Sequence, residues 1–352
     1  MSPRAFAVLI LAAVVASCGD SAESGHDANT PWPLSEFPPL PEGMKDVPAA
    51  RIELGHLLFY DAVLSVDQQT SCSTCHSERW GLSDALRRSV GHGAGLLAGP
   101  GRAGPNTVRR NSPTLYNLAF RETLTWDGSA GSLEEQVLIP LFDDDEMAAD
   151  PETIVRDLSD VPEYVAMFSE AFPDNPEISV ENLASALAAY QRTFLSMDAL
   201  YDKYAAGRTL VMTEDMIDGM FRFAEMGCHD CHAPPLFESE TFADRGVAEV
   251  EGIVDDGREE ITARPEDRGK FRAVTLRNIV FTAPYFHNGT VDSLQDAVRH
   301  ELAQGERPFT DEDVRLIALF IGQGLRDETN EAIRPASLPS GLPLSVDDPG
   351  SR

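Results

Sequence analysis

Apolar residues recur along most of the chain at the three- to four-residue spacing that is typical of amphipathic helices. The pattern predicts helices from Val47 onward, after Ser132, over 151–158, 161–172 and 179–197, over 213–226, from Ser293 to about Gln304, and after Thr310. Few stretches alternate at the two-residue spacing of a strand. The fold class predicted from this pattern is therefore mainly α.

The segments between these helices are predicted to be loops. A glycine-rich stretch follows Gly91 and continues to Pro105; it has too few apolar side chains to form a core, which predicts a mobile loop. Residues 233–270 are acidic and show no clear period. The tail 327–352 is rich in proline and serine, and its composition predicts disorder.

The first 18 residues have the pattern of an export signal. Arg4 precedes an apolar run, Ala5 to Val15, which is too short for a comfortable membrane span. Small residues before Cys18 predict a lipoprotein-type signal peptide, residues 1–18, with Cys18 lipidated; the alternative is ordinary cleavage near Ser17, which leaves Cys18 as a free thiol. Either route places the protein in the periplasm. Residues 19–46 are predicted to be a flexible linker.

The composition restricts the partners of the protein. Its 352 residues include 58 acidic and 28 basic side chains, giving a formal charge of −30. This balance excludes general nucleic-acid binding, which requires a basic surface. It favours a partner with a basic patch, or it serves only to keep an exported protein soluble.

Four of the five cysteines form two C-x-x-C-H motifs, the attachment signature of c-type haem. The motifs comprise Cys72, Cys75 and His76, and then Cys228, Cys231 and His232. In such motifs the cysteines form thioethers with the haem and the histidine binds its iron. A redox-active dithiol pair or a four-cysteine zinc site is the alternative, but neither explains the histidine after each pair. The chain is therefore predicted to form two tandem cytochrome c-type domains, 47–200 and 201–326, each with one covalent haem.

Further motifs resemble those of the bacterial di-haem cytochrome c peroxidases, a family that includes the enzyme maturing the tryptophan cofactor of methylamine dehydrogenase. The resemblance extends from about Ala50 to Leu325. Besides both haem motifs, it is carried by Gly91-His92-Gly93, Arg110-Asn111-Ser112-Pro113-Thr114, Trp126-Asp127-Gly128, Ser132 to Gln136, Glu146-Met147, Thr275 to Asn278 and Ala283 to Gly289. Trp126, Gln136 and Glu146 are ten residues apart, as in the family pattern.

The resemblance implies three catalytic residues. Glu146 would move a proton between the oxygens of peroxide, Gln136 would hydrogen-bond the bound oxygen, and Trp126 would relay electrons between the haems. Read without the family pattern, these residues are a solvated acid, a polar residue of an amphipathic helix and a buried aromatic.

The resemblance also implies metal ligands. His92 would bind the iron of the N-terminal haem in the oxidised resting state, and Asn111 with the carbonyls of Thr282 and Pro284 would bind a calcium ion, a hard cation that prefers oxygen ligands. The family's methionine ligand to the C-terminal haem is absent here; Glu301 occupies its place and His300 precedes it. We expect His300 to be the sixth ligand; the alternative is that His300 faces solvent and the iron binds water.

The expected function is therefore that of an exported, membrane-anchored di-haem peroxidase. It would reduce hydrogen peroxide with electrons from a small c-type cytochrome or a cupredoxin, entering at the C-terminal haem. The resemblance is also compatible with a homodimer. Two rival functions stay open, namely a related oxidase that modifies tryptophan in a partner protein and a plain di-haem electron carrier.

Overall fold

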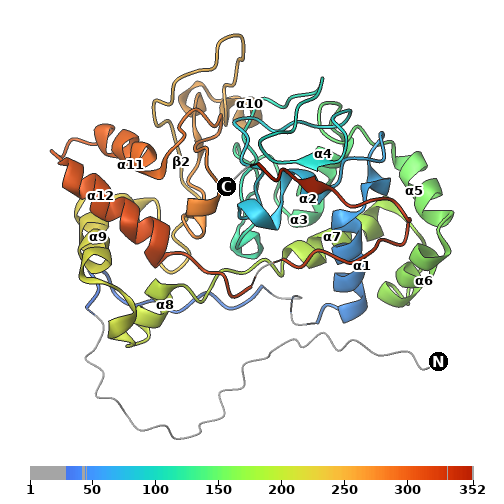
Figure 1. Cartoon of the computed structure of the whole chain (residues 1–352), viewed down its shortest axis with the longest axis horizontal. Helices are drawn as coiled ribbons and strands as arrows, with labels where there is room; N and C mark the ends of the chain where they lie inside the picture. Colours follow the sequence, from blue (N-terminus) through green and yellow to red (C-terminus); the bar gives the residue numbers. More distant parts are fainter. Residues whose placement is uncertain (1–28, 42–43, 45, 331, 351–352) are drawn as a thin grey trace, which may run out of the picture.

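The computed structural model describes residues 29–41, 44, 46–330 and 332–350. In this part of the chain the structure is mainly helical, as predicted, and strands are short (Figure 1). The α-helices are α1 (Ala49–Tyr60), α2 (Cys72–Cys75), α3 (Leu133–Gln136), α4 (Leu138–Phe142), α5 (Pro151–Ser159), α6 (Pro162–Ala171), α7 (Val180–Gln191), α8 (Leu200–Ala205), α9 (Glu214–Glu225), α10 (Glu259–Thr262), α11 (Leu294–Ala303) and α12 (Asp311–Leu319).

Shorter elements connect these helices. The 3-10 turns are η1 (Ala62–Leu64), η2 (Glu78–Trp80), η3 (Leu118–Phe120), η4 (Thr209–Val211), η5 (Cys228–Asp230), η6 (Pro265–Asp267) and η7 (Ile279–Phe281), and η8 (Phe320–Gly324) is a π-helical turn that continues α12. Strand β1 (Leu97–Ala98) pairs in parallel with β4 (Val346–Asp347), and β2 (Phe242–Ala243) pairs antiparallel with β3 (Phe271–Arg272).

The buried apolar side chains form two separate clusters. The first core joins residues between Leu54 and Phe194, together with Leu338, and packs α1 against α7 and α6. The second core joins residues between Tyr201 and Leu325, together with Trp32, and packs α9 against α12. In Figure 1 the helices of the first core lie towards one end of the molecule and those of the second core towards the other end, with loops between them.

Helix boundaries follow the capping residues that the sequence offers. Ser132, Thr213, Ser293 and Thr310 each accept a hydrogen bond from a backbone N–H three residues later, at the starts of α3, α9, α11 and α12. Helix α7 ends at Gln191, earlier than predicted. The amide of Asn117 bonds both the N–H and the carbonyl of Ser196, which holds the chain after α7 away from helical geometry.

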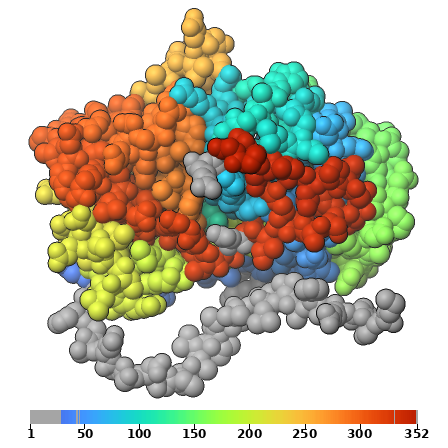
Figure 2. Space-filling view, viewed as in Figure 1, coloured from blue at the N-terminus to red at the C-terminus, as the bar shows by residue number. Residues whose placement is uncertain are grey.

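The C-terminal segment packs on the first core, contrary to the disorder predicted from its composition. Residues 332–350, here called the strap, insert Leu338 into the first core and pair β4 with β1. Figure 2 shows the strap as a red band across the face of the molecule. Its polar side chains also bond other segments, as in the hydrogen bond from Ser340 Oγ to Asp61 Oδ1, 2.8 Å long. Such pairings depend on tertiary contacts and are invisible to composition.

Part of the predicted flexible linker is also packed. Trp32 lies in the second core and donates its Nε1–H to the Tyr201 hydroxyl, 2.8 Å away. The ring of Phe37 lies beneath the guanidinium of Arg277, 4.8 Å from its centroid. The predicted signal peptide and Cys18 lie outside the described residues. No helix in the described ranges is long and apolar enough to cross a membrane.

The glycine-rich stretch after Gly91, predicted to be mobile, is organised around Arg102. This residue is only 4% exposed, and its guanidinium donates all five of its N–H groups to acceptors inside the protein. The acceptors are the carbonyls of Val90, Gly91, Gly95 and Leu97 and the hydroxyl of Thr70. A single buried arginine therefore provides the order that the glycines do not.

Candidate functional site

The first C-x-x-C-H motif forms one short helix and its cap. Cys72 and Cys75 are the first and last residues of α2, and His76 follows with its backbone N–H bonded to the carbonyl of Cys72 at 2.9 Å. The Nδ1 atom of His76 lies 2.9 Å from the carbonyl oxygen of Leu82. A neutral imidazole that donates through Nδ1 keeps Nε2 for a metal, the arrangement usual for histidine ligands.

The second motif repeats these contacts on a 3-10 turn, η5, in place of an α-helix. His232 N bonds the carbonyl of Cys228 at 2.9 Å, and His232 Nδ1 lies 3.2 Å from the carbonyl oxygen of Phe237. Leu82 and Phe237, which supply the two carbonyls, both adopt positive φ, 61° and 53°. The two sites therefore share a backbone design as well as a motif.

A threonine and an asparagine extend this correspondence. Thr114 Oγ1 bonds the carbonyl of Gly81, and Thr275 Oγ1 bonds that of Leu236, in each case the residue before the histidine's acceptor. Three residues later, Asn117 and Asn278 both adopt positive φ, 62° and 59°, and each begins a 3-10 turn. The segments around Thr114 and Thr275 are therefore structural equivalents.

Each motif faces its own cavity. The second cavity, about 840 Å³, is lined by Cys228, Cys231 and His232, among other residues. The first cavity, about 40 Å³, is lined by Cys72, Cys75 and His76, among others. The donor set and the room of the second cavity fit a c-type haem. The first has the same donor set, but its walls lie closer together than a macrocycle requires and would have to part around it.

The protonation states suit haem attachment better than the alternatives. Burial lowers the pKa of His76 to about 4, and burial also lowers that of His232, so both imidazoles are neutral. Burial raises the pKa of Cys72 and of Cys228 to about 12. A redox-active cysteine needs its thiolate. The two pairs also face different cavities, and the described chain contains no cluster of three or more metal-binding side chains.

Two of the three predicted catalytic residues meet at the first cavity. Gln136, the last residue of α3, and Glu146 both line it with His76. The Oε1 atom of Gln136 is buried and has no hydrogen-bond partner, so it can accept a hydrogen bond from a bound ligand. Burial, together with the charges of Asp143 and Asp145, raises the pKa of Glu146 to about 7.

Trp126 lies at the second cavity, at the junction of the two halves. Its Nε1–H donates to the carbonyl of Asn111 at 2.9 Å, and its own carbonyl accepts from Arg272 N. Its ring meets that of His287 edge-on, with the centroids 6.5 Å apart. His287 in turn stacks on Phe271 at 3.5 Å.

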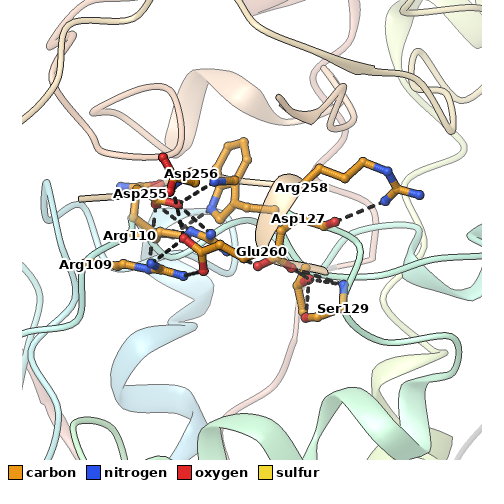
Figure 3. A network of polar contacts seen from close by, with 12 residues as sticks. Arg109, Arg110, Asp127, Ser129, Asp255, Asp256, Arg258 and Glu260 are labelled. Carbon is orange, nitrogen blue, oxygen red and sulfur yellow. Dashed lines mark hydrogen bonds and ion pairs between the residues drawn. The ribbon is translucent and has the colours of Figure 1, made fainter. Parts of the chain in front are cut away.

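A network of ion pairs surrounds this junction (Figure 3). The guanidinium of Arg110 pairs with Asp127 at 2.5 Å and with Asp255 at 2.7 Å, and all three side chains are nearly buried. Arg109 pairs with Glu260, and Arg258 bonds the carbonyl of Asp127. Charged residues of the 233–270 segment, Asp255 and Arg258, therefore hold the turn after Trp126 against the second half.

The predicted iron ligands on the far sides of the cavities lie outside them. His92 Nε2 lies within hydrogen-bond distance of Asp144 O and of the Asn106 amide, although its backbone N–H bonds the carbonyl of Glu146. His300 Nε2 lies 2.7 Å from the carbonyl of Arg245. Glu301, rather than His300, lines the second cavity, where its carboxylate pairs with the Arg245 guanidinium at 2.6 Å.

The residues predicted to bind calcium, Asn111, Thr282 and Pro284, all line the second cavity. The Asn111 amide donates its Nδ2–H to the carbonyl of Leu86 at 2.7 Å, so its Oδ1 is the side-chain atom that a cation would bind.

Sequence reasoning missed three residues that the structure brings to the sites. These are Arg102, which fixes the loop beside the first cavity, Ser112, which contacts His76, and Arg245, which holds Glu301. Ser112 alone had a signal in the sequence, because it lies inside the motif around Asn111. The other two act through backbone carbonyls or across long loops, and no local pattern marks such contacts.

Two equivalent C-x-x-C-H sites on a mainly helical scaffold define the class, a protein built to hold two c-type haems. Comparison with known proteins agrees. Residues 49–210 match the family model described as di-haem cytochrome c peroxidase. The chain is 34% identical to cytochrome c551 peroxidase of Pseudomonas aeruginosa, over 86% of this chain and 88% of that protein. It is 33% identical to the methylamine utilization protein MauG of Methylorubrum extorquens, over 73% and 70%.

A solved structure extends the comparison. A MauG-like protein associated with microbial copper homeostasis superposes with a TM-score of 0.73 at 28% identity, over 86% of this chain and 97% of that one. The di-haem peroxidase BthA of Burkholderia thailandensis shares the fold, with a TM-score of 0.68 at 22% identity. The chain belongs to the di-haem cytochrome c peroxidase family, which includes MauG.

Proposed function

We propose that the protein is a di-haem peroxidase made of two tandem cytochrome c units, residues 47–200 and 201–326. Each unit would bind one haem covalently, through Cys72 and Cys75 in the first and Cys228 and Cys231 in the second. His76 and His232 would be the proximal ligands. The two separate cores, the equivalent backbone designs of the two sites and the family membership support this arrangement.

The reaction at the first cavity is the reduction of hydrogen peroxide by two electrons and two protons to two molecules of water. The bound haem supplies the redox-active iron. Glu146 takes a proton from one peroxide oxygen and delivers it to the other, and the Gln136 carboxamide orients the peroxide by hydrogen bonding. The observation that carries this proposal is that Glu146, with its pKa near 7, shares the cavity of His76 with Gln136.

Electrons would enter at the second site from a small c-type cytochrome or a cupredoxin and pass Trp126 on the way to the first. His92 would bind the first iron in the oxidised resting state and leave on reduction. Support comes from its backbone, which bonds the carbonyl of Glu146 at the edge of the first cavity, and from the glycines on both sides of it, which permit the ring to swing.

The test is steady-state peroxide turnover with reduced cytochrome c, with and without prior one-electron reduction of the enzyme. We expect turnover that requires the prior reduction. Glu146→Gln should lower it about 100-fold or more, the scale of general acid–base catalysis, while both haems stay attached. Turnover within a few-fold of the wild type in this variant would remove Glu146 from the mechanism.

A tryptophan-modifying oxidase is the second candidate. The observation that favours it is Glu301, because α11 presents no methionine to the second cavity. A thioether ligand raises a haem potential, so its absence makes acceptance of electrons from ordinary donors less favourable. Suppose that the protein carries two intact haems but reduces peroxide with none of the reduced cytochromes and cupredoxins tried. That result would favour the oxidase over the peroxidase.

We also propose export to the periplasm, anchoring through lipid on Cys18, and a calcium ion bound by Asn111, Thr282 and Pro284. The apolar run before Cys18 supports the anchor, and the shared cavity edge supports the calcium site. Cys18→Ser should move the protein from the membrane to the soluble fraction. Homodimer formation is a further proposal that sedimentation of the purified protein tests.

A further inference from the structure

Ser112 touches both halves of the molecule. It is only 7% exposed and lines the second cavity, the one that contains His232. Its hydroxyl nevertheless contacts the first motif, with Oγ 2.8 Å from the carbonyl oxygen of Cys75 and 3.2 Å from Nδ1 of His76. The preceding residue, Asn111, accepts the Nε1–H of Trp126 on its carbonyl.

The hydrogen-bond chemistry at Ser112 has one consistent assignment. The hydroxyl donates its hydrogen to the Cys75 carbonyl, so a lone pair on Oγ faces the ring of His76. The Nδ1–H of His76 is then shared between Ser112 Oγ and the carbonyl of Leu82. A histidine whose Nδ1–H has more acceptors is a more basic ligand at Nε2.

The second site lacks this hydroxyl. Counting back two residues from the equivalent threonines, Thr114 and Thr275, places Ala273 where the first half has Ser112. Ala273 lines the second cavity, and no hydroxyl in the described chain contacts the His232 ring, whose Nδ1 faces the Phe237 carbonyl. The hydroxyl of Ser112 is therefore one difference between the hydrogen bonds at Nδ1 of His76 and at Nδ1 of His232.

We propose that Ser112 is a positioning residue that adds a difference between the proximal histidines of the two haem sites and connects these sites. Its hydroxyl makes His76 the more basic ligand, which lowers the reduction potential of the first haem relative to the second. Through Asn111 it also completes a contact path from Trp126 to His76, along which one electron passes from the second site to the first with no transfer of atoms. The electron path depends on the proposed peroxidase reaction, whereas the difference in potential requires only that both haems are bound.

Reciprocal substitutions test the proposal on the haem-loaded protein. Ser112→Ala should raise the potential of the first haem and leave the second unchanged, in a redox titration that resolves the two haem spectra. Ala273→Ser should lower the potential of the second haem. Exchange of an electron between the haems after one-electron reduction should slow in Ser112→Ala, and turnover should fall about 10-fold, as is usual when the partner of a metal ligand is removed.

Matched controls separate the hydroxyl from packing. Ser83 is fully buried and donates its hydroxyl to the Ser112 carbonyl at 2.7 Å without contacting His76, so Ser83→Ala should leave both potentials unchanged. Threonine and valine have nearly the same shape, but only threonine keeps the hydroxyl. Ser112→Val should therefore raise the potential of the first haem as Ser112→Ala does, whereas Ser112→Thr should not.

Two results would overturn the proposal, namely unchanged potentials in Ser112→Ala or equal shifts in the Thr and Val variants. A wild type without peroxide turnover would reject the proposed function, yet the titrations would still decide the role of Ser112.

Discussion

At the residue scale, Glu146 ends an acidic run that begins at Asp143, so its ionisation depends on its neighbours. Asp143 and Asp145 are exposed, whereas Glu146 lines the first cavity. Burial and these two charges raise its pKa to about 7. Only the ionised carboxylate accepts a proton from peroxide, so the activity limb that Glu146 controls should rise with pH through about 7.

The first prediction alters this pKa from outside the cavity. Asp145→Asn removes one of the two charges that disfavour ionisation of Glu146, so the pKa of Glu146 falls and the rising limb of kcat/KM moves to lower pH. The measurement is the pH profile of peroxide turnover. Asp160→Asn, which removes an exposed charge beyond the end of α5, is the control and should leave the profile in place. If the rising limb of kcat/KM stays at the same pH in Asp145→Asn, a group other than Glu146 controls that limb.

The choice between His300 and Glu301 shows what the sequence could have predicted. On α11 the residues that line the second cavity are spaced as on one helical face: Leu294, Ala297, Val298, Glu301 and Leu302. His300 is off that face. Helical spacing alone therefore selects Glu301, whereas preference for an iron-binding side chain selected His300. The motif histidines were predicted from sequence because C-x-x-C-H is a local motif, whereas Gln136 and Glu146 were predicted only from the family resemblance. The ring position of His92 depends on contacts with Asn106 and Asp144, which no local motif marks.

The second prediction uses this difference. Glu301→Met places a thioether on the face of α11 that lines the second cavity, so it should raise the potential of the C-terminal haem and add the methionine-to-iron band in the red. His300→Met is the matched control and should do neither, because that position faces the Arg245 carbonyl. Redox titration and the visible spectrum measure both effects. A methionine band in His300→Met would restore His300 as the residue nearest the iron.

At the scale of elements, the strap fixes the first attachment helix and the loop beside it. Ser345 Oγ lies 3.4 Å from Ser73 Oγ of α2, and Asp347 accepts the hydroxyl of Ser77, the residue after His76. Strand β4 pairs with β1 within the loop that Arg102 organises. The spacing of apolar residues predicted the helices because an amphipathic pattern is local. Composition missed the strap, whose order comes from partners more than 200 residues away in sequence.

The third prediction concerns the ion pair between Arg334 and Asp347 within the strap. Arg334 pairs with Glu78 at 2.8 Å and with Asp347 at 3.1 Å, while Ser77 donates to the same Asp347 oxygen. Asp347→Asn weakens both bonds to this charged acceptor and should lower the free energy of unfolding by about 1–3 kcal/mol, the usual range for charged hydrogen bonds.

The control for Asp347→Asn is another arginine–aspartate pair. Asp292 pairs with Arg87 at 2.9 Å, but both side chains are more than 60% exposed. Exposed pairs contribute about 1 kcal/mol or less, so Asp292→Asn should have the smaller effect. Urea unfolding monitored at the first haem measures both variants. Equal losses would show that the strap adds no more than an ordinary surface contact.

At the scale of the whole molecule, the two halves are connected by charged side chains at their junction. The Arg110 guanidinium joins Asp127 and Asp255 across the junction (Figure 3), and Trp126 directly precedes Asp127 in the sequence. The terminal segments cross over, since Trp32 packs in the second core and Leu338 in the first. These contacts tie each half to the other and favour a fixed separation of the two sites.

The charge of the whole molecule leads to the last prediction. With a formal charge of −30, the protein attracts a basic donor over distances beyond contact. Salt screens such attraction, with a Debye length of about 10 Å at 0.1 M. The kcat/KM for a basic cytochrome c should therefore fall steeply as salt rises, whereas an uncharged small reductant should show little change and an acidic cytochrome should improve. Stopped-flow or steady-state rates across ionic strength provide the measurement. Equal salt dependence for basic and uncharged donors would mean that the acidic surface serves solubility and does not steer the donor.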